Sequence, residues 1–209
     1  MPRNIAKLIE AWFLEHDGDG EFLAGRRACP YSLIGSVGAA ARIIYTTKPS
    51  IVCAAMAPAP PPSIGIVGRY GLPSKADLIW IRKLIARQQL LFLGDMDPVD
   101  LLVFAWLRAS LHPTRIGYLG INDAFLGSLR LSSTRSIYGR CAPSEVESRV
   151  LLRQVFPDLR ETLGRRNAEL LERGHKVELD VIVSTRRSVA GALASLPCQI
   201  YPSRTEEKW

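Results

Sequence analysis

A regular alternation of short apolar runs and amphipathic stretches between residues 64 and 119 constrains the fold more than any other feature. Residues 64–67, 90–93 and 116–119 have the length and composition of buried strands. The two stretches between them carry apolar residues three and four positions apart, as helices with one buried face do. These residues are Leu78, Ile81, Leu84 and Ile85, followed by Val99, Leu102, Val103, Trp106 and Leu107. Strands that alternate with helices predict an α/β protein with a parallel sheet flanked by crossover helices.

The flanking sequence extends this pattern less regularly. We expect an N-terminal helical and loop segment over residues 1–45, an α/β domain over residues 46–190 and a tail over residues 191–209. Residues 39–45 fit either a helix or a strand, and the apolar residues 49–56 predict a short strand. The chain therefore predicts one main domain with a helical appendage.

Two local patterns add detail to this outline. Ser74 with Asp77 three residues later is typical of a capping box, so the first crossover helix should begin there. Residues 176–184 alternate like a strand, although their charges also suit a helix. Both alternatives for this last stretch stay open.

The chain is basic, with a net charge of +7 and an isoelectric point near 9.5. Such a balance favours a polyanionic partner, and nucleic acid is the commonest one. Most of the basic residues are arginines, and arginine binds phosphate in bidentate fashion better than lysine does. We therefore expect DNA as a partner, and a homodimer or a partner subunit is also compatible. The alternative is a basic protein whose charges are spread evenly and serve no such partner.

The cysteines and the hydropathy pattern indicate the cellular compartment of the protein. The four cysteines are far apart and none lies near one of the three histidines, so a structural zinc site is not expected. Scattered single thiols suit a reducing cytosol. The N-terminus lacks the uninterrupted apolar core of a signal peptide, and the most apolar stretch, residues 51–67, contains four prolines. We expect a soluble, cytoplasmic protein without a membrane partner.

Asp95 and Asp97 follow the apolar run 90–93 almost directly. Carboxylates at the carboxyl end of a strand lie where open α/β folds bind ligands. Two acids in one loop repel each other unless a cation lies between them, and Mg²⁺ binds one or two carboxylates together with phosphate oxygens. The alternative is an Asp-Pro turn in which Asp97 caps the next helix. We favour a site for Mg²⁺, or Mn²⁺, that faces a phosphate.

These acids belong to a series of motifs that resembles the Toprim domain in its topoisomerase VI A-subunit form. The meiotic double-strand-break enzyme and the nuclease subunit of the bacterial Wadjet defence system share this form. The resemblance covers about residues 45–185 and lies in the order and spacing of the motifs. These are a Gly-Arg-Tyr-Gly turn at residues 68–71 with Pro73, the acids Asp95 and Asp97 before Pro98, the run 118–121, and Lys176 with Glu178.

The resemblance implies a Toprim-like fold and Mg²⁺-dependent chemistry on DNA, either as a nuclease or as a topoisomerase-like subunit. Asp95 and Asp97 would be the catalytic residues and would hold the metal. Arg69 and Lys75, in the loop next to the acids, are expected to contact the DNA backbone. The alternative is a catalytically degenerate Toprim module that binds nucleic acid or a partner protein without cleavage.

Two positions depart from the Toprim pattern. Toprim domains carry a glutamate on their first strand, and the equivalent strand here is expected within residues 50–56, where Cys53 takes its place. Asp100 stands where the family has glycine. Asp100 is either a replacement carboxylate, and so a third metal ligand, or an acid in the first helical turn that interacts favourably with the helix dipole.

Two further candidates have simpler alternatives. A topoisomerase-like reaction needs a nucleophilic tyrosine, and Tyr31 lies near Arg26 and Arg27, which could hold a phosphate. We favour a loop tyrosine packed on the surface instead. Asp123 is either an extra acid near the edge of the sheet or a turn residue.

Overall fold

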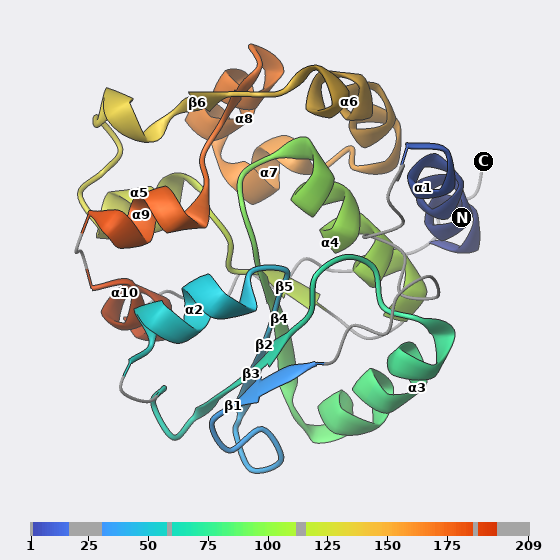
Figure 1. Cartoon of the computed structure of the whole chain (residues 1–209), viewed down its shortest axis with the longest axis vertical. Coiled ribbons are helices and arrows are strands. Elements are labelled where there is room, and N and C mark those ends of the chain that lie inside the picture. Colours follow the sequence, from blue (N-terminus) through green and yellow to red (C-terminus); the bar gives the residue numbers. More distant parts are fainter. Residues whose placement is uncertain (1, 17–30, 58–59, 112–115, 186–187, 196–209) are drawn as a thin grey trace.

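The computed structural model describes residues 2–16, 31–57, 60–111, 116–185 and 188–195. Its centre is a five-stranded sheet in the order β1-β3-β2-β4-β5, with helices on both sides (Figure 1). The strands are β1 (Ser32–Ile34), β2 (Arg42–Thr46), β3 (Ile64–Gly68), β4 (Gln89–Leu93) and β5 (Ile116–Tyr118). β2 to β5 pair in parallel, and β1 pairs antiparallel with β3 at one edge. This mostly parallel sheet confirms the α/β prediction.

The helices are distributed along the whole described chain. The first half contains α1 (Pro2–His16), α2 (Pro49–Ala55), α3 (Lys75–Leu84), the 3-10 turn η1 (Ile85–Arg87) and α4 (Pro98–Leu111). The second half contains α5 (Asp123–Ser128), η2 (Arg135–Ile137), α6 (Pro143–Val155), α7 (Leu159–Leu163), α8 (Arg165–Glu172), α9 (Leu179–Ser184) and α10 (Val189–Ser195). β6 (Gly139–Arg140) and β7 (His175–Lys176) form a separate antiparallel pair.

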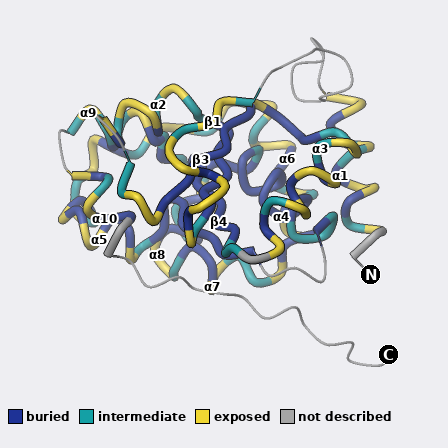
Figure 2. The backbone as a smooth tube through the Cα atoms, turned by 90° about the horizontal axis from the view of Figure 1, so that it is seen from below, coloured by how far each residue is buried: buried dark blue, intermediate teal, exposed yellow. Residues whose placement is uncertain are grey.

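The core is built around the sheet, and α4 is its most buried helix. All residues of β3 and all but the first of β4 are buried. Figure 2 shows β3 and β4 in the buried centre and exposed residues mainly toward the outside of the molecule. α4 is buried on nearly all sides, because α1, α6 and β5 pack against it. A helix that is apolar all round is typical of such a position, and it holds the start of α4 firmly against the end of β4.

The stretch 49–56 contains the helix α2 (Pro49–Ala55) and no strand, so its prediction as a strand was wrong. Pro49 begins α2, where its missing N–H costs no helical hydrogen bond. Val52 and Met56, four residues apart, are buried while Cys53 is exposed, which is a helical pattern. The strand that lies between β3 and β4 is β2, which comes mostly from the ambiguous stretch 39–45. Because β1 and β2 both belong to the sheet, the α/β unit begins within the segment 1–45.

The structure also decides the two local sequence patterns, the capping box at Ser74 and the stretch 176–184. The Asp77 N–H donates to Ser74 Oγ and the Ser74 N–H to the Asp77 carboxylate, which confirms the capping box at the start of α3. The ambiguous stretch 176–184 divides into an antiparallel bridge between Val177 and Met96 and the helix α9. Among the described residues, no helix combines the length and the apolar character needed to cross a membrane.

Candidate metal centre

Three carboxylates, those of Asp95, Asp97 and Asp100, lie together at the carboxyl end of β4. Each offers one oxygen within 4.8 Å of the other two, and all three residues are buried. Asp95 and Asp97 lie in the turn after β4, and Asp100 lies in the first turn of α4. The structure therefore brings together the three residues that the sequence suggested as metal ligands, including Asp100.

The turn between β4 and α4 holds these acids through its own backbone. α4 begins at Pro98, and Oδ1 of the preceding Asp97 accepts the Asp100 N–H at 2.8 Å, as an N-cap residue does. Asp100 reaches back, and its Oδ2 accepts the Asp95 N–H at 2.7 Å. Asp97 therefore caps the helix and still keeps its carboxylate beside the other two.

Gly94 leaves the room that this arrangement needs. A Cβ at this position would lie 2.5 Å from Asp100 Oδ2 and 2.9 Å from the ring of Phe92. Both distances are shorter than van der Waals contact, so a side chain at position 94 would displace the carboxylate or the ring. Close approach of this kind is one of the reasons for which a chain needs glycine.

The end of β2 supplies two polar side chains to the site that sequence reasoning missed. The Thr47 hydroxyl donates to Asp100 Oδ2 at 2.8 Å, and the Lys48 ammonium lies 2.9 Å from Asp95 Oδ2. Because β2 and β4 are parallel neighbours, the residues that follow both strands meet at the same edge of the sheet. The available signal was the Thr-Thr-Lys sequence directly after an apolar run, but that run fitted a helix as well as a strand.

The hydrogen bonds leave two carboxylate oxygens of the cluster open. Both oxygens of Asp95 are engaged, because Oδ1 accepts the Leu179 N–H at 2.7 Å and Oδ2 pairs with Lys48. Asp97 Oδ2 and Asp100 Oδ1 accept no hydrogen bond from any residue that the structure describes. Carboxylate oxygens are the ligands that Mg²⁺ prefers in proteins, usually together with water and phosphate oxygens. The donor set therefore fits a hard divalent cation.

Burial raises the pKa of all three carboxyls, and the charges of neighbouring acids add to the shift. Burial raises the pKa of Asp100 to about 7, and the charge of Asp95 adds to this shift while Lys48 opposes it. Burial, followed by the charges of Asp100 and Asp95, holds the pKa of Asp97 well above its usual range. Burial also raises the pKa of Asp95, against the lowering effect of Lys48. Three such carboxylates are fully charged at neutral pH only when cations neutralise them.

Lys48 supplies one of these positive charges. Burial alone would lower the pKa of Lys48, but the ion pair with Asp95 and the charges of Asp100 and Asp97 together raise it by more, so Lys48 is charged at neutral pH. One ammonium group neutralises one of the three carboxylates. Full ionisation of the other two carboxyls therefore calls for a further cation.

A second group of charged residues borders the cluster. The Lys176 ammonium lies between the carboxylates of Glu145, at 2.9 Å, and Glu178, at 2.7 Å. The antiparallel bridge between Met96 and Val177 brings this segment against the turn after β4. Lys176 and Glu178, which resemble the terminal Lys-x-Glu of Toprim domains of this type, therefore lie next to the acids.

The two basic residues predicted to contact DNA differ in accessibility. Arg69 is only 5% exposed, and its guanidinium pairs with Asp77 at 3.1 Å and lies over the ring of Tyr31. Lys75 is exposed at the first position of α3. Lys75 therefore presents its charge to solvent, whereas Arg69 uses its charge inside the protein. Contact with DNA stays a prediction for Lys75, and for Arg69 it requires that the guanidinium leave Asp77.

Tyr31 has the environment of a packed side chain. Its ring lies against that of Trp80, with centroids 5.3 Å apart, and against the guanidinium of Arg69. Burial raises the pKa of Tyr31 well above its ordinary value, with the charge of Asp77 adding to the shift. A hydroxyl that holds its proton this firmly is poorly suited to nucleophilic attack. Arg26 and Arg27 lie outside the described residues.

Two other candidates lie away from the acids. Cys53 is exposed on α2 and does not lie on the strand next to β4, so its assignment to the place of the Toprim glutamate was wrong. The residue that follows β2 and contacts the cluster is Thr47. Asp123 accepts the backbone N–H groups of Arg166 and Asn167 and so caps the start of α8.

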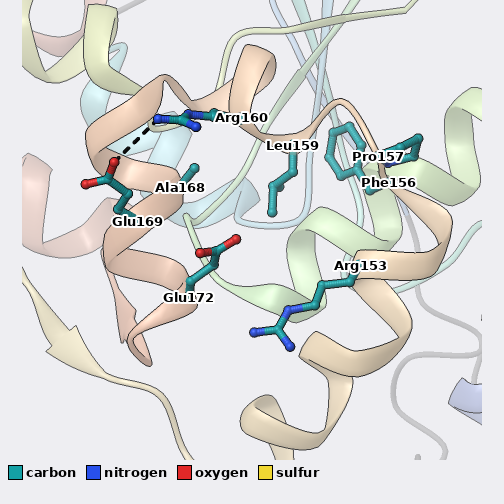
Figure 3. A pocket seen from close by; sticks show the side chains of 8 residues that line it. All are labelled: Arg153, Phe156, Pro157, Leu159, Arg160, Ala168, Glu169 and Glu172. Atoms are coloured by element: carbon teal, nitrogen blue, oxygen red, sulfur yellow. Dashed lines mark ion pairs between the residues drawn. The ribbon is translucent and has the colours of Figure 1, made fainter.

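A separate hollow of about 190 Å³ lies where α6, α7 and α8 meet (Figure 3). It is lined by Arg153, Phe156, Pro157, Leu159, Arg160, Ala168, Glu169 and Glu172. Arg160 lies 3.5 Å from Glu169, and the lining carries two arginines and two glutamates, so its charges largely neutralise one another. We assign no function to this hollow.

Comparison of the sequence with family models and with curated proteins gives no match. The case for a function therefore depends on the geometry of the acidic cluster and on the motifs around it.

Proposed function

We propose that this chain is a Toprim-type protein that cleaves DNA strands with Mg²⁺ or Mn²⁺, as a nuclease or as a topoisomerase-like subunit. The observation that carries the proposal is the position of the three carboxylates. They lie within 4.8 Å of one another at the carboxyl end of a strand in a mostly parallel sheet. Ligands of open α/β sheets bind at this edge.

The open oxygens of Asp97 and Asp100 would hold the metal. A divalent cation bound there supplies positive charge that stabilises the negative charge developing on a scissile phosphate. Asp95 is anchored by the Leu179 N–H and by Lys48, and it fixes the position of Asp100 through its own N–H. Such preorganisation is what an electrostatic mechanism needs. We assign no general base.

DNA is the proposed substrate for two reasons. The net charge of +7 favours a polyanion, and the exposed Lys75 lies at the amino end of α3, in the segment that precedes β4. The resemblance of the motifs to the topoisomerase VI A-subunit type adds DNA strand cleavage as the reaction. A homodimer or a partner subunit is compatible with this proposal and is not required by it.

A catalytically degenerate Toprim module is the second candidate, and two observations favour it. The Lys48 ammonium lies 2.9 Å from Asp95 Oδ2, so a protein cation already occupies one side of the acidic cluster. In addition, the strand next to β4 is followed by Thr47, whereas the Toprim resemblance leads one to expect a glutamate on the first strand. Such a module would bind nucleic acid or a partner protein without cleavage.

Nicking of supercoiled plasmid in Mg²⁺ or Mn²⁺ separates the two candidates. We expect cleavage by the native protein and by Glu147→Gln, in which an exposed carboxylate is removed. Asp97→Asn and Asp100→Asn should lose it, because each removes a proposed ligand. Equal cleavage by the native protein and Asp97→Asn, or none from either, would overturn the catalytic proposal. DNA binding with a steep salt dependence and no cleavage would favour the module.

A further inference from the structure

Lys48 lies beside the acidic cluster and pairs with one of its three carboxylates. It follows β2 directly, and its ammonium approaches Asp95 Oδ2 to 2.9 Å. The Lys48 side chain is about one-third exposed while that of Asp95 is buried, so Lys48 covers Asp95 from the solvent side. The neighbouring Thr47 is held by its hydrogen bond to Asp100, which fixes the backbone from which Lys48 extends.

The three carboxylates differ in how many of their oxygens are already engaged. Asp95 uses one oxygen for the Leu179 N–H and the other for Lys48. Asp97 and Asp100 each use one oxygen for hydrogen bonds within the site and leave the other open to a ligand, as far as the described residues extend. Open ligand atoms are therefore found on Asp97 and Asp100 and not on Asp95, whose second oxygen pairs with Lys48.

We propose that Lys48 is a built-in cation that limits this centre to a single divalent ion, held by Asp97 and Asp100. In two-metal sites that act on phosphates, two ions about 3.5–4 Å apart share a small set of carboxylates. Here the ammonium takes the place of one of them at Asp95, because a compact, strongly hydrated positive charge repels a second ion from the same oxygen. The inference rests on the proposed metal centre and adds the number of ions and the residue that sets it.

The test is the number of Mn²⁺ ions bound per chain, measured by titration with detection of free Mn²⁺ by electron paramagnetic resonance. We expect one ion for the native protein. We expect two for Lys48→Met, in which a side chain of similar length carries no charge, and tighter binding of the first ion by roughly tenfold. Lys48→Arg keeps the charge and should keep one ion. Lys83→Met, which removes an exposed lysine of α3, is the matched control and should also bind one.

The possible outcomes distinguish a failure of the role of Lys48 from a failure of the metal centre. Two ions in the native protein, or one ion in both the native protein and Lys48→Met with equal affinity, would overturn the role of Lys48 and leave the metal centre intact. No ion in either protein would overturn the metal centre itself. No ion in the native protein and one in Lys48→Met would contradict the single-ion centre and favour the non-catalytic module. Circular dichroism in EDTA establishes that each variant is folded, and Lys48→Gln replaces Lys48→Met if the latter is not.

Discussion

Asp100 Oδ2 accepts the backbone N–H of Asp95 at 2.7 Å, so a carboxylate in the first turn of α4 reaches back to the end of β4. The same oxygen accepts the Thr47 hydroxyl, and the Asp100 N–H donates to Asp97. Asp100 therefore joins β2, β4 and α4 through hydrogen bonds, although burial and the charge of Asp95 make its ionised form unfavourable. The hydrogen bonds stabilise the fold while the charge opposes it, and substitution can separate the two effects.

Asp100→Asn should make the metal-free protein more stable and insensitive to Mg²⁺. The amide keeps an oxygen for the Asp95 N–H and the Thr47 hydroxyl but carries no charge, so the buried repulsion is relieved. In EDTA we expect a gain of about 1 kcal/mol or more in the free energy of unfolding. Mg²⁺ should raise the melting temperature of the native protein and leave that of the variant unchanged, as followed by circular dichroism.

Asp100→Ala is the control for the hydrogen bonds. It removes the charge as well, but it leaves the Asp95 N–H and the Thr47 hydroxyl without an acceptor. We expect it to be less stable than Asp100→Asn by about 1–3 kcal/mol. An Asp100→Asn variant that is less stable than the native protein in EDTA would show that the charge of Asp100 is not unfavourable.

The raised pKa values predict that the metal-free protein loses stability as the pH rises. Asp100 has a pKa of about 7 in the folded protein, against an ordinary value of 3.8, so the folded state holds this proton more tightly. Its stabilising contribution is complete below the ordinary pKa and is lost as the pH rises through about 7. We expect the free energy of unfolding in EDTA, measured with urea, to fall by a few kcal/mol between about pH 5 and pH 7.5. Saturating Mg²⁺ should abolish most of the fall, and Asp100→Asn should reduce it; an equal fall in both proteins would assign it to other groups.

The parts of the site that could be predicted are those formed by neighbours in the sequence. Asp95 and Asp97 follow an apolar run directly, and Asp100 lies one helical turn further, so local patterns place all three at a strand end. The hydrogen bond from Thr47 to Asp100 joins residues 53 positions apart. It exists only because β2 pairs with β4, and no local pattern in either strand specifies that pairing.

The fold shows the same division between local and tertiary information. The alternation between residues 64 and 119 predicted β3 to β5 because each element there has a clear period. The stretch 49–56 was misassigned because a short apolar run fits a strand as well as a helix. Its helical signals were Pro49 at the start and the four-residue spacing of Val52 and Met56. The burial of Arg69 depends on an ion pair with α3 that its position in the loop did not reveal.

Gly94→Ala should abolish metal binding in a protein that still folds. The added methyl group would lie 2.5 Å from Asp100 Oδ2, so this carboxylate must leave its present position in the cluster. We expect the Mg²⁺-dependent increase in melting temperature to disappear, with a loss of about 1–3 kcal/mol in stability from crowding at Phe92. Gly38→Ala is the matched control, because a Cβ at that position meets no atom within 4 Å. A normal response of Gly94→Ala to Mg²⁺ would show that the position of Asp100 does not control the metal.

Lys75→Met should weaken DNA binding without changing stability. Lys75 is exposed at the start of α3, so the substitution removes one positive charge and no internal contact. We expect a similar loss of affinity on every DNA sequence and a salt dependence whose slope falls by about one. Fluorescence anisotropy of a labelled duplex at several salt concentrations measures both. An unchanged slope would place the DNA surface elsewhere on the protein.

Arg69→Met should do the opposite, lowering stability while the folded protein binds DNA normally. The guanidinium is buried, pairs with Asp77 and lies over the Tyr31 ring, so its removal leaves the Asp77 carboxylate with its capping hydrogen bond but without its cation. We expect a loss of about 2 kcal/mol in the free energy of unfolding, measured with urea. The double variant Arg69→Met with Asp77→Asn should lose less than the sum of the two single losses, because the partners are coupled. Arg69→Met with native stability and weakened DNA binding would instead make Arg69 a DNA contact, which requires that it leave Asp77 when DNA binds.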